Sequence, residues 1–216
     1  MAPVQVKICG LTRPADAVAA VAAGAAFIGL VFFARSPRHV DPARAREVAL
    51  AVPAGIVKVG LFVDPDDATL DAVLASVPLD MLQLHGTESP ARVAAIRART
   101  GRPVMKALGI AVPEDLEVAE GHAHAADMLL LDARPPQGAD RPGGHGRSFD
   151  WSLLAGRRLA RPWMLAGGLT PVTVARAVAE SGARAVDVSS GVESAPGIKD
   201  PAAMRAFIDA ASRVAP

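Results

Sequence analysis

Cys9 and Asp132 are the two side chains of this chain that stand where a proton transfer could take place. Cys9 is the sole cysteine and ends the stretch Val4–Cys9, in which apolar and polar residues alternate, so its thiol extends the polar face of a predicted strand to the strand's C-terminal tip. A free cysteine is more often a small buried apolar residue, and the thiol alone does not specify a reaction. Asp132 ends an apolar run, where a carboxyl group can have a raised pKa and act as a general acid, or can simply cap a turn.

Two short runs rich in glycine and serine could bind an anion. Each follows an apolar run: Ala166-Gly167-Gly168 and Ser189-Ser190-Gly191. Backbone N–H groups and hydroxyls donate to phosphate oxygens, and glycine lets the backbone approach the anion closely. Either run alone could be an ordinary turn, but the pair favours a phosphorylated substrate.

The remaining polar candidates are an arginine and two histidines. Arg38, in Arg35-Ser36-Pro37-Arg38-His39, could hold a substrate carboxylate through two parallel hydrogen bonds, although a loop arginine is more commonly solvated. His122 and His124 lie two residues apart on a predicted helix and do not share a face, so they predict no metal site. The sequence contains no P-loop, and no G-x-G-x-x-G motif follows a predicted strand, so it indicates no cofactor.

The elements that must position these residues are eight strand-like runs separated by alanine-rich stretches with helical spacing. Strands that alternate with helices indicate parallel βαβ units. The predicted strands are Val4–Cys9, Phe27–Phe32, Val57–Val63, Met81–His85, Val104–Leu108, Met128–Asp132, Trp163–Ala166 and Ala185–Ser189. Eight such units predict an α/β fold, a single (β/α)8 TIM barrel, with a doubly wound open sheet as the alternative.

Helix boundaries are marked by capping residues and by glycines. A side-chain oxygen satisfies a free N–H at the start of a helix, and proline at the first helical position gives up a donor that has no partner there. Five such pairs predict helix starts: Asp41-Pro42, Asp64-Pro65, Ser89-Pro90, Thr170-Pro171 and Asp200-Pro201. Glycine favours the left-handed conformation that ends a helix, which predicts helix ends at Gly24, Gly101 and Gly182.

Polar residues inside the predicted strands favour the barrel. Strands of a doubly wound sheet are nearly continuous in apolar residues, whereas a barrel strand turns one face to the helices and the other to the barrel interior. Turning the polar faces inward groups Lys7 with Cys9, Lys58 with Gly60 and Phe62, Gln83 with His85, and Asp187 with Ser189. Lys106 points inward by the same reasoning. We expect these three buried lysines to have carboxylate or carbonyl partners, Asp187 among them.

Barrel topology would bring the chemical candidates to one end of the molecule. Active sites of such barrels form at the C-terminal ends of the strands, and the loops after the seventh and eighth strands commonly bind phosphate. The stretch from Pro135 to Gly146 is long and contains Gly143 and Gly144, so it could close over a substrate or be a plain surface loop. Cys9 and Asp132 would face each other across the mouth, an arrangement that suits isomerisation, lyase or aldol chemistry without a cofactor.

Composition restricts the partners and the compartment. The chain has 216 residues, 51% of them hydrophobic and 21% charged, with a formal charge of +1, which predicts one globular domain over residues 1–216. Without blocks of like charge or an apolar run of ~18 residues, neither a nucleic acid nor a membrane is expected as a partner. One cysteine and a first strand close to Met1 indicate a cytoplasmic protein without a disulfide or a signal peptide. The expected partner is a small phosphorylated molecule, and the oligomeric state, monomer or homodimer, stays open.

Several longer motifs span most of the chain. The most specific are the first and the last, Val6-Lys7-Ile8-Cys9-Gly10 and Val186-Asp187-Val188-Ser189-Ser190-Gly191-Val192-Glu193. Between them lie Ile28-Gly29-Leu30-Val31-Phe32, Val59-Gly60-Leu61-Phe62-Val63, Gln83-Leu84-His85-Gly86, Leu130-Leu131-Asp132, Phe149-Asp150-Trp151 and Gly167-Gly168-Leu169-Thr170-Pro171. Together these motifs resemble the phosphoribosylanthranilate isomerase family of tryptophan biosynthesis, although other phosphate-binding barrels share the Gly-Gly run.

This resemblance implies a cofactor-free Amadori rearrangement of N-(5-phosphoribosyl)anthranilate to 1-(2-carboxyphenylamino)-1-deoxyribulose 5-phosphate. It makes Cys9 the general base and Asp132 the general acid, and it places Arg38 on the anthranilate carboxylate. It assigns the phosphate to Gly167, Gly168, Ser189, Ser190 and Gly191, and it places His85 and Asp187 near the ribose. The two catalytic groups would need opposite protonation states, which implies a depressed pKa for the thiol and a raised pKa for the carboxyl group.

Three features depart from the family pattern. His39 stands where a tyrosine is common, Ala166 replaces a common serine, and the loop from Asp132 to Phe149 is longer than usual. These changes leave Cys9 and Asp132 themselves in place.

Three other functions share part of this set of residues. The sister isomerase of histidine biosynthesis performs the same rearrangement on another ribonucleotide, but it has an aspartate in place of Cys9. A Schiff-base aldolase would use Lys106 in the fifth predicted strand. A protein that only binds a phosphorylated sugar would leave Cys9 and Asp132 dispensable.

Overall fold

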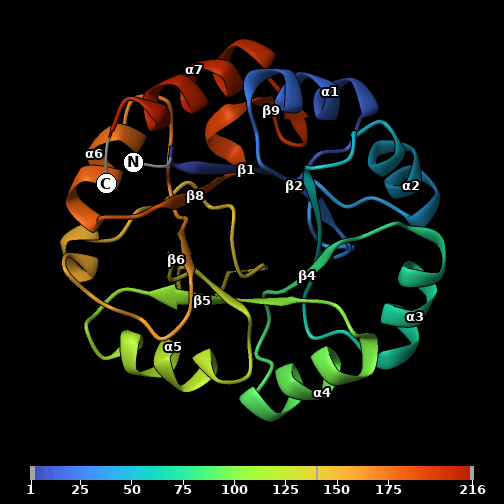
Figure 1. Cartoon of the computed structure of the whole chain (residues 1–216), viewed down its shortest axis with the longest axis horizontal. Helices are drawn as coiled ribbons and strands as arrows, with labels where there is room; N and C mark the ends of the chain where they lie inside the picture. The colour runs from blue at the N-terminus through green and yellow to red at the C-terminus, as the bar shows by residue number, and fades with distance from the viewer. Residues whose placement is uncertain (1–2, 140, 215–216) are drawn as a thin grey trace.

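The computed structural model describes residues 3–139 and 141–214 and contains a closed barrel of eight parallel strands, arranged in chain order (Figure 1). Closure is visible in the pairing, because the first strand pairs with the second and also with the eighth. The strands are β1 Gln5–Cys9, β2 Phe27–Val31, β3 Val57–Phe62, β4 Met81–Leu84, β5 Val104–Ile110, β6 Met128–Ala133, β7 Trp163–Leu165 and β8 Ala185–Val188. The predicted (β/α)8 barrel is confirmed, and the open doubly wound sheet is excluded.

Helices form a ring around the barrel (Figure 1). The described residues contain α1 Pro14–Ala23, α2 Pro42–Leu50, α3 Asp67–Ser76, α4 Pro90–Thr100, α5 Asp115–Ala123, α6 Val174–Ser181 and α7 Pro201–Ser212. The expected helix after β6 is replaced by a short 3-10 helix, η1 Trp151–Leu154, because the preceding residues form a loop rich in proline and glycine. Across residues 3–139 and 141–214, no helix has the length and apolar character needed to cross a bilayer.

Most of the predicted helix ends are confirmed. The side chains of Asp41, Ser89 and Asp200 accept hydrogen bonds from backbone N–H groups in the first turns of α2, α4 and α7. The three predicted glycines, Gly24, Gly101 and Gly182, end α1, α4 and α6 in the left-handed conformation. These local signals therefore fix the ends of the helices that surround the barrel.

Two predicted helix starts are wrong, because α3 and α6 begin two and three residues after the prolines that were expected to start them. Asp64 has a left-handed backbone (φ 45°), and its carboxylate accepts from the N–H of Thr87 at 2.6 Å, so it braces the loop after β4. Helix α3 begins at Asp67 instead, capped by Asp66. Thr170 and Thr173 exchange hydrogen bonds between backbone N–H and hydroxyl at 2.9 and 3.2 Å, and this closed turn delays α6 to Val174.

The barrel strands separate an inner layer from an outer one. Inner apolar side chains include Val59, Met105, Leu130 and Met164, which pack against one another inside the barrel. The predicted inward positions of three polar strand residues agree with this alternation: Lys7, Gln83 and Asp187 are flanked in sequence by residues of the outer layer. Lys7 also has the predicted carboxylate partner, because its Nζ donates to Asp187 Oδ1 at 2.8 Å.

The predicted inward positions of Lys58 and Lys106 are wrong. Their registered neighbours in the sheet, Ile28 and Leu84, belong to the outer layer against the helices, and registered parallel neighbours point to the same face. Phe62 also lies in this outer layer, so the whole predicted inner set of β3 faces outward. In β3 both alternating sets contain apolar residues, and the pattern therefore cannot decide which face is inside.

An additional hairpin follows β8 and was not predicted. The 3-10 helix η2 (Ser190–Val192) leads into the antiparallel strands β9 (Glu193–Ala195) and β10 (Ile198–Lys199) before α7 begins. These strands are too short to give a periodic sequence signal. The hairpin lies at the end of the barrel that holds the candidate site.

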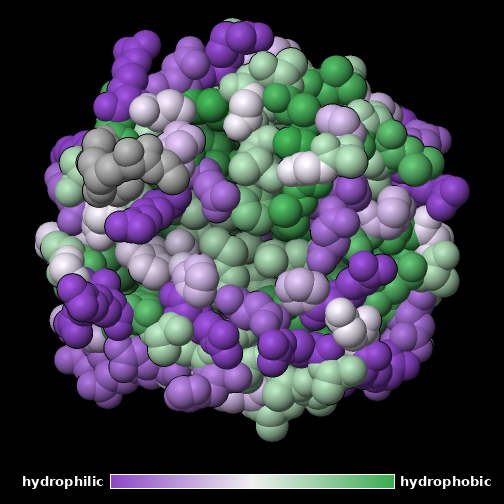
Figure 2. All heavy atoms as spheres, viewed as in Figure 1, coloured by the Kyte–Doolittle hydropathy of each residue, from purple (hydrophilic) through white to green (hydrophobic). Residues whose placement is uncertain are grey.

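The surface in Figure 2 shows hydrophilic side chains over much of the rim and apolar ones concentrated over α1 and α2. Val18 in α1 and Leu50 in α2 are 52% and 62% exposed. These two exposed apolar side chains lie on helices of the ring that surrounds the barrel.

Candidate active site

The C-terminal ends of the strands bring the predicted site residues together around two adjoining hollows. Asp132, Asp187 and Ser189 line both hollows. Cys9, Arg38 and His85 line one of them, and Gly167, Gly168, Ser190 and Gly191 line the other. The structure therefore gathers every residue predicted for the site into one place.

Cys9 ends β1 and is buried, with 4% of its surface exposed. It has room because the neighbouring strand carries Gly29, where an added Cβ would stand 2.7 Å from the Cys9 sulfur. Burial raises the pKa of the Cys9 thiol, and the positive charge of Lys7 opposes this effect only in part, because Asp187 acts in the other direction. The pKa of the Cys9 thiol is therefore raised, and not depressed as the family resemblance implies.

Lys7 and Asp187 form a buried ion pair directly below the thiol. Lys7 is fully buried, two residues before Cys9 on the same face of β1. Burial alone would lower the pKa of Lys7, but Asp187 and Cys9 favour the ammonium and raise it. Lys7 thus remains charged, which provides a fixed positive charge for an anion formed on Cys9.

Asp132 stands at the end of β6 with its two carboxyl oxygens in different surroundings. Oδ1 accepts from the backbone N–H of Ala133 at 2.8 Å, and Oδ2 lies 3.5 Å from His85 Nε2. Burial and the nearby charge of Asp187 raise the pKa of Asp132 to about 7. This carboxyl group can therefore hold a proton near neutral pH, as a general acid must.

His85 is an uncharged neighbour of this acid. Burial, with the positive charges of Lys106 and Lys7, lowers the pKa of His85 to about 3. Its Nδ1 lies 3.5 Å from the side-chain nitrogen of Gln83, so the imidazole is held between Gln83 and Asp132. A neutral ring adds no charge that would drive the proton off Asp132.

The two glycine-containing loops meet in a hollow suited to phosphate. Gly167 and Gly168 have positive φ values of 92° and 63°, which glycine adopts without strain. An added Cβ at Gly167 would come within 2.6 Å of the Ala133 nitrogen, and one at Gly191 would collide with the Leu169 carbonyl. Only glycine therefore lets these backbones pack closely around the hollow.

Arg38 is held by a carboxylate that the sequence analysis did not identify. Its Nε and Nη2 donate to the two oxygens of Glu193 at 2.7 and 2.8 Å, and the side chain is buried. Glu193 also accepts from Lys199 Nζ at 2.6 Å. The glutamate was visible at the end of the last motif, but no sequence signal paired it with Arg38.

The long loop after β6 lies across the mouth of the barrel, in the position expected of a cover. An added Cβ at Gly143 would stand 2.7 Å from His85 and 2.8 Å from Asp132, and one at Gly144 would stand 2.8 Å from Arg38 Nη1. Both hollows include residues of this loop. Asp140 of the expected loop lies outside the described residues.

Lys106 does not reach this site. Its ammonium donates to Glu88 at 2.8 Å and to the Gly86 carbonyl at 2.8 Å, in the layer between barrel and helices. A lysine fixed there cannot form a Schiff base with a ligand in the hollows, so the geometry disfavours the aldolase alternative. The arrangement instead offers a buried carboxyl group and a buried thiol that line the same hollow at the mouth of the barrel.

Comparison with known proteins agrees with this arrangement. The family model described as N-(5'-phosphoribosyl)anthranilate isomerase matches residues 6–210. The N-(5'-phosphoribosyl)anthranilate isomerase of Paracoccus denitrificans is 62% identical over 205 residues, covering 95% of this chain and 95% of that protein. The enzyme of the same name from Cereibacter sphaeroides is 60% identical over 211 residues, covering 98% of this chain and all of the relative.

Solved structures lead to the same group. The phosphoribosylanthranilate isomerase of Thermotoga maritima superimposes with a TM-score of 0.88 at 37% identity, covering 98% of this chain and 100% of that one. A phosphoribosylanthranilate isomerase in complex with reduced 1-(o-carboxyphenylamino)-1-deoxyribulose 5-phosphate superimposes with a TM-score of 0.85 at 35% identity, with the same coverage. These likenesses extend over the barrel and its C-terminal mouth.

Proposed function

The chain belongs to the N-(5'-phosphoribosyl)anthranilate isomerase family, and we propose that Cys9 and Asp132 transfer the protons of its reaction. It is an isomerase of tryptophan biosynthesis, which converts N-(5-phosphoribosyl)anthranilate to 1-(2-carboxyphenylamino)-1-deoxyribulose 5-phosphate. The observation that supports our assignment is the contrast between two buried groups at one mouth. Burial and a neighbouring carboxylate keep a proton on Asp132, whereas a fixed ammonium stands beside Cys9.

Ring opening is the step that needs an acid. Asp132 donates its proton to the ribose ring oxygen while the anthranilate nitrogen forms a double bond to C1′, which breaks the C1′–O bond and leaves a protonated Schiff base. A carboxyl group with a pKa of about 7 is protonated at the start of this step, and it becomes an anion beside neutral His85.

The second step needs a base. Cys9, as thiolate, removes the proton from C2′, and the electron pair of that C–H bond neutralises the Schiff base to give an enolamine, which tautomerises to the ketone. Lys7 stabilises the thiolate electrostatically, because its charged ammonium lies on the same face of β1.

The reactive form of the site has its proton on Asp132 and not on Cys9, which is the reverse of the order of their pKa values. The thiol has a raised pKa and the carboxyl group a pKa of about 7. Near neutral pH the reactive pairing of thiolate and carboxylic acid is therefore a minor tautomer of the singly protonated pair. The reaction draws on this tautomer, and its pH dependence is therefore a property of the coupled pair.

The remaining residues orient the substrate. We assign the phosphate to the hollow lined by Gly167, Gly168, Ser190 and Gly191, the ribose to the space near His85 and Asp187, and the carboxylate to Arg38. Ser189 lines both hollows, and its hydroxyl, which donates to the Cys9 carbonyl at 3.0 Å, holds the start of the loop at the phosphate end. The loop with Gly143 and Gly144 excludes water above the reacting atoms.

We propose that one chain, residues 1–216, forms one catalytic domain that works in the cytoplasm as a monomer or a homodimer. All candidate site residues come from a single barrel, so activity per chain should not depend on protein concentration. A working thiol at Cys9 suits a reducing compartment. Analytical ultracentrifugation beside kcat measurements over the same concentrations tests the first point, and cell fractionation tests the second.

The decisive experiment follows the loss of phosphoribosylanthranilate fluorescence with purified protein. We expect turnover by the parent chain without added cofactor, and retained substrate binding with little turnover in the Cys9→Ala and Asp132→Asn variants. Parent-like turnover in both variants would refute the assignment of the proton-transfer pair.

A further inference from the structure

We propose that Glu193 and Lys199 are positioning residues of the substrate site: Glu193 aims Arg38 at the substrate carboxylate, and Lys199 anchors Ser189 and the end of β1. The inference rests on the proposed function, in which Arg38 binds that carboxylate. Neither residue lines the hollow that holds Cys9 and Asp132. Both therefore act through the residues that do.

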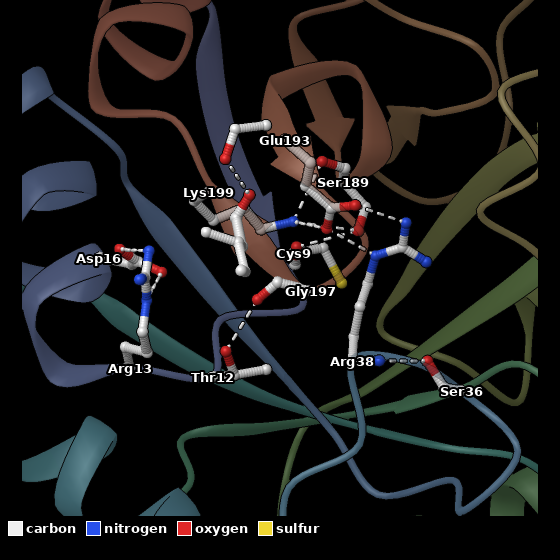
Figure 3. A network of polar contacts seen from close by, with 12 residues as sticks. Cys9, Thr12, Arg13, Asp16, Ser36, Arg38, Ser189, Glu193, Gly197 and Lys199 are labelled. Atoms are coloured by element: carbon white, nitrogen blue, oxygen red, sulfur yellow. Dashed lines mark hydrogen bonds and ion pairs between the residues drawn. The ribbon is translucent and has the colours of Figure 1, made fainter.

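The contacts form one connected network, which Figure 3 shows around the Glu193 carboxylate. Arg38 and Lys199 both donate to Glu193, from Nε and Nη2 at 2.7 and 2.8 Å and from Nζ at 2.6 Å. Lys199 also donates to the carbonyl and the hydroxyl of Ser189 at 3.0 and 3.3 Å. The Ser189 hydroxyl in turn donates to the Cys9 carbonyl at 3.0 Å.

The charges of this network depend on one carboxylate. Arg38, Glu193 and Lys199 have side chains that are 7%, 5% and 0% exposed, so two cations share one anion out of contact with water. Burial alone would raise the pKa of Glu193, but Arg38 and Lys199 lower it, which keeps the carboxylate ionised. Without this anion the two cations would face each other unscreened.

Glu193 also determines which edge of Arg38 is available. The Nε and Nη2 edge is occupied by the carboxylate, and Nη1 faces Gly144 of the covering loop. The aliphatic part of Arg38 packs on Gly10, where an added Cβ would collide with Cδ. The guanidinium is thus held at its stem and along one edge, which leaves the Nη1 end directed into the hollow.

The hairpin after β8 holds this pair in place. Glu193 and Lys199 are registered partners across β9 and β10, so their side chains meet on the same face. The turn of the hairpin is fixed by Gly197, whose carbonyl accepts from the Thr12 hydroxyl at 2.8 Å. An added Cβ at Gly197 would stand 2.7 Å from the Pro37 carbonyl, so the hairpin joins the loops that follow β1, β2 and β8.

The test compares two ligands on matched variants. The first is reduced 1-(o-carboxyphenylamino)-1-deoxyribulose 5-phosphate, and the second is the same compound with an unsubstituted phenylamino ring. We expect Glu193→Gln to weaken binding of the first ligand about 10–100-fold, the weight of hydrogen bonds to a charged group, and binding of the second by less than about threefold. KM should rise by a similar factor while kcat changes by no more than about threefold.

Two further variants complete the comparison. Glu193→Asp keeps the charge and should recover part of the preference for the carboxylated ligand. The exposed pair of Arg44 and Glu47 on α2 offers a matched control, because Glu47→Gln makes the same chemical change far from the site and should alter neither ligand nor turnover. Thermal unfolding of each variant distinguishes loss of the fold from displacement of the Arg38 guanidinium.

The outcomes distinguish this inference from the proposed function. Arg38→Gln should show the same selective loss of the carboxylated ligand, and if it does not, the proposed role of Arg38 falls and this inference falls with it. If Arg38→Gln shows the loss but Glu193→Gln binds both ligands as the parent does, or loses both equally, the inference alone is overturned. If Glu193→Gln does not fold, the Glu193→Asp variant decides by the same ratio of the two ligands.

Discussion

The barrel mouth has a Cys9 side and an Asp132 side, which are both buried but differ in charge. Cys9 and Asp132 are 4% and 9% exposed, so removal of water affects both. Around Cys9 stand the cations Lys7 and Lys199, each paired with a carboxylate. Beside Asp132 the nearest titratable ring, His85, is neutral because its pKa is lowered to about 3. Burial alone therefore does not determine the chemistry of either group.

This difference shows how one barrel can support an acid and a base in the same pocket. Burial favours the neutral form of a carboxyl group and of a thiol alike. On the Asp132 side the effect of burial is opposed only by smaller effects, so the carboxyl group keeps its proton up to near neutral pH. On the Cys9 side the fixed cations oppose it, so an anion formed there during the reaction meets compensating charge.

The largest expected effect comes from removing either reacting group. We expect Cys9→Ala and Asp132→Asn each to lower kcat by about 10²–10⁴-fold, the usual contribution of one general acid or base, while far-ultraviolet circular dichroism stays unchanged. Asp209→Asn, on the exposed face of α7, makes the same substitution away from the site and should leave kcat unchanged. A loss below tenfold in both site variants would show that neither side of the mouth performs proton transfer.

Removing the cation of the Cys9 side should destabilise the fold. Lys7→Met leaves Asp187 as an unpaired charge inside the barrel, and we expect a loss of about 3–5 kcal/mol in the free energy of unfolding, measured by urea denaturation. The double variant Lys7→Met/Asp187→Asn removes both charges and should regain most of that stability without regaining turnover. Equal stability of the single and double variants would mean that the pair contributes little.

Replacing Asp132, on the other side of the mouth, should stabilise the fold above neutral pH. The folded-state pKa of Asp132 is about 7, well above the ordinary value of 3.8, so the stabilisation from its bound proton is full below pH 4 and is lost as pH rises to 7. We therefore expect the stability of Asp132→Asn relative to the parent to increase between pH 4 and pH 8, by about 4 kcal/mol. A stability difference that does not change with pH would contradict the raised pKa.

The sequence was sufficient for residues whose position follows from strand alternation and barrel topology. Cys9, His85 and Asp132 reach the mouth because each lies at the C-terminal end of a strand, within it or directly after it. The two glycine-containing loops follow the seventh and eighth strands. Capping chemistry fixed most helix ends for a similar reason, since it depends on neighbours a few residues away.

The sequence was insufficient where the partner is distant in the chain or where both strand faces look alike. Lys58 and Lys106 face the helices although alternation alone placed them inside. The contact between Arg38 and Glu193 spans 155 positions and depends on a hairpin whose strands have three and two residues. The pKa of Cys9 depends on burial and on Asp187, which no local pattern reports.

The smallest expected effect is a change in the pH dependence of kcat/KM. It tests the difference between Cys9 and Asp132 most directly, because one pH profile reports the titration of both groups. Since the active form carries a single proton on the pair, kcat/KM should rise tenfold per pH unit up to about pH 7, where Asp132 titrates, and should fall above the ordinary range of a thiol, where Cys9 titrates. Asp132→Asn should abolish the rise that ends near pH 7 and leave a rise only at higher pH, where Cys9 becomes a thiolate. Lys199→Met should shift only the falling limb, to higher pH, because Lys199 lowers the pKa of Cys9. A rise that still ends near pH 7 in Asp132→Asn would assign this titration to another group and contradict the role of Asp132 as the acid.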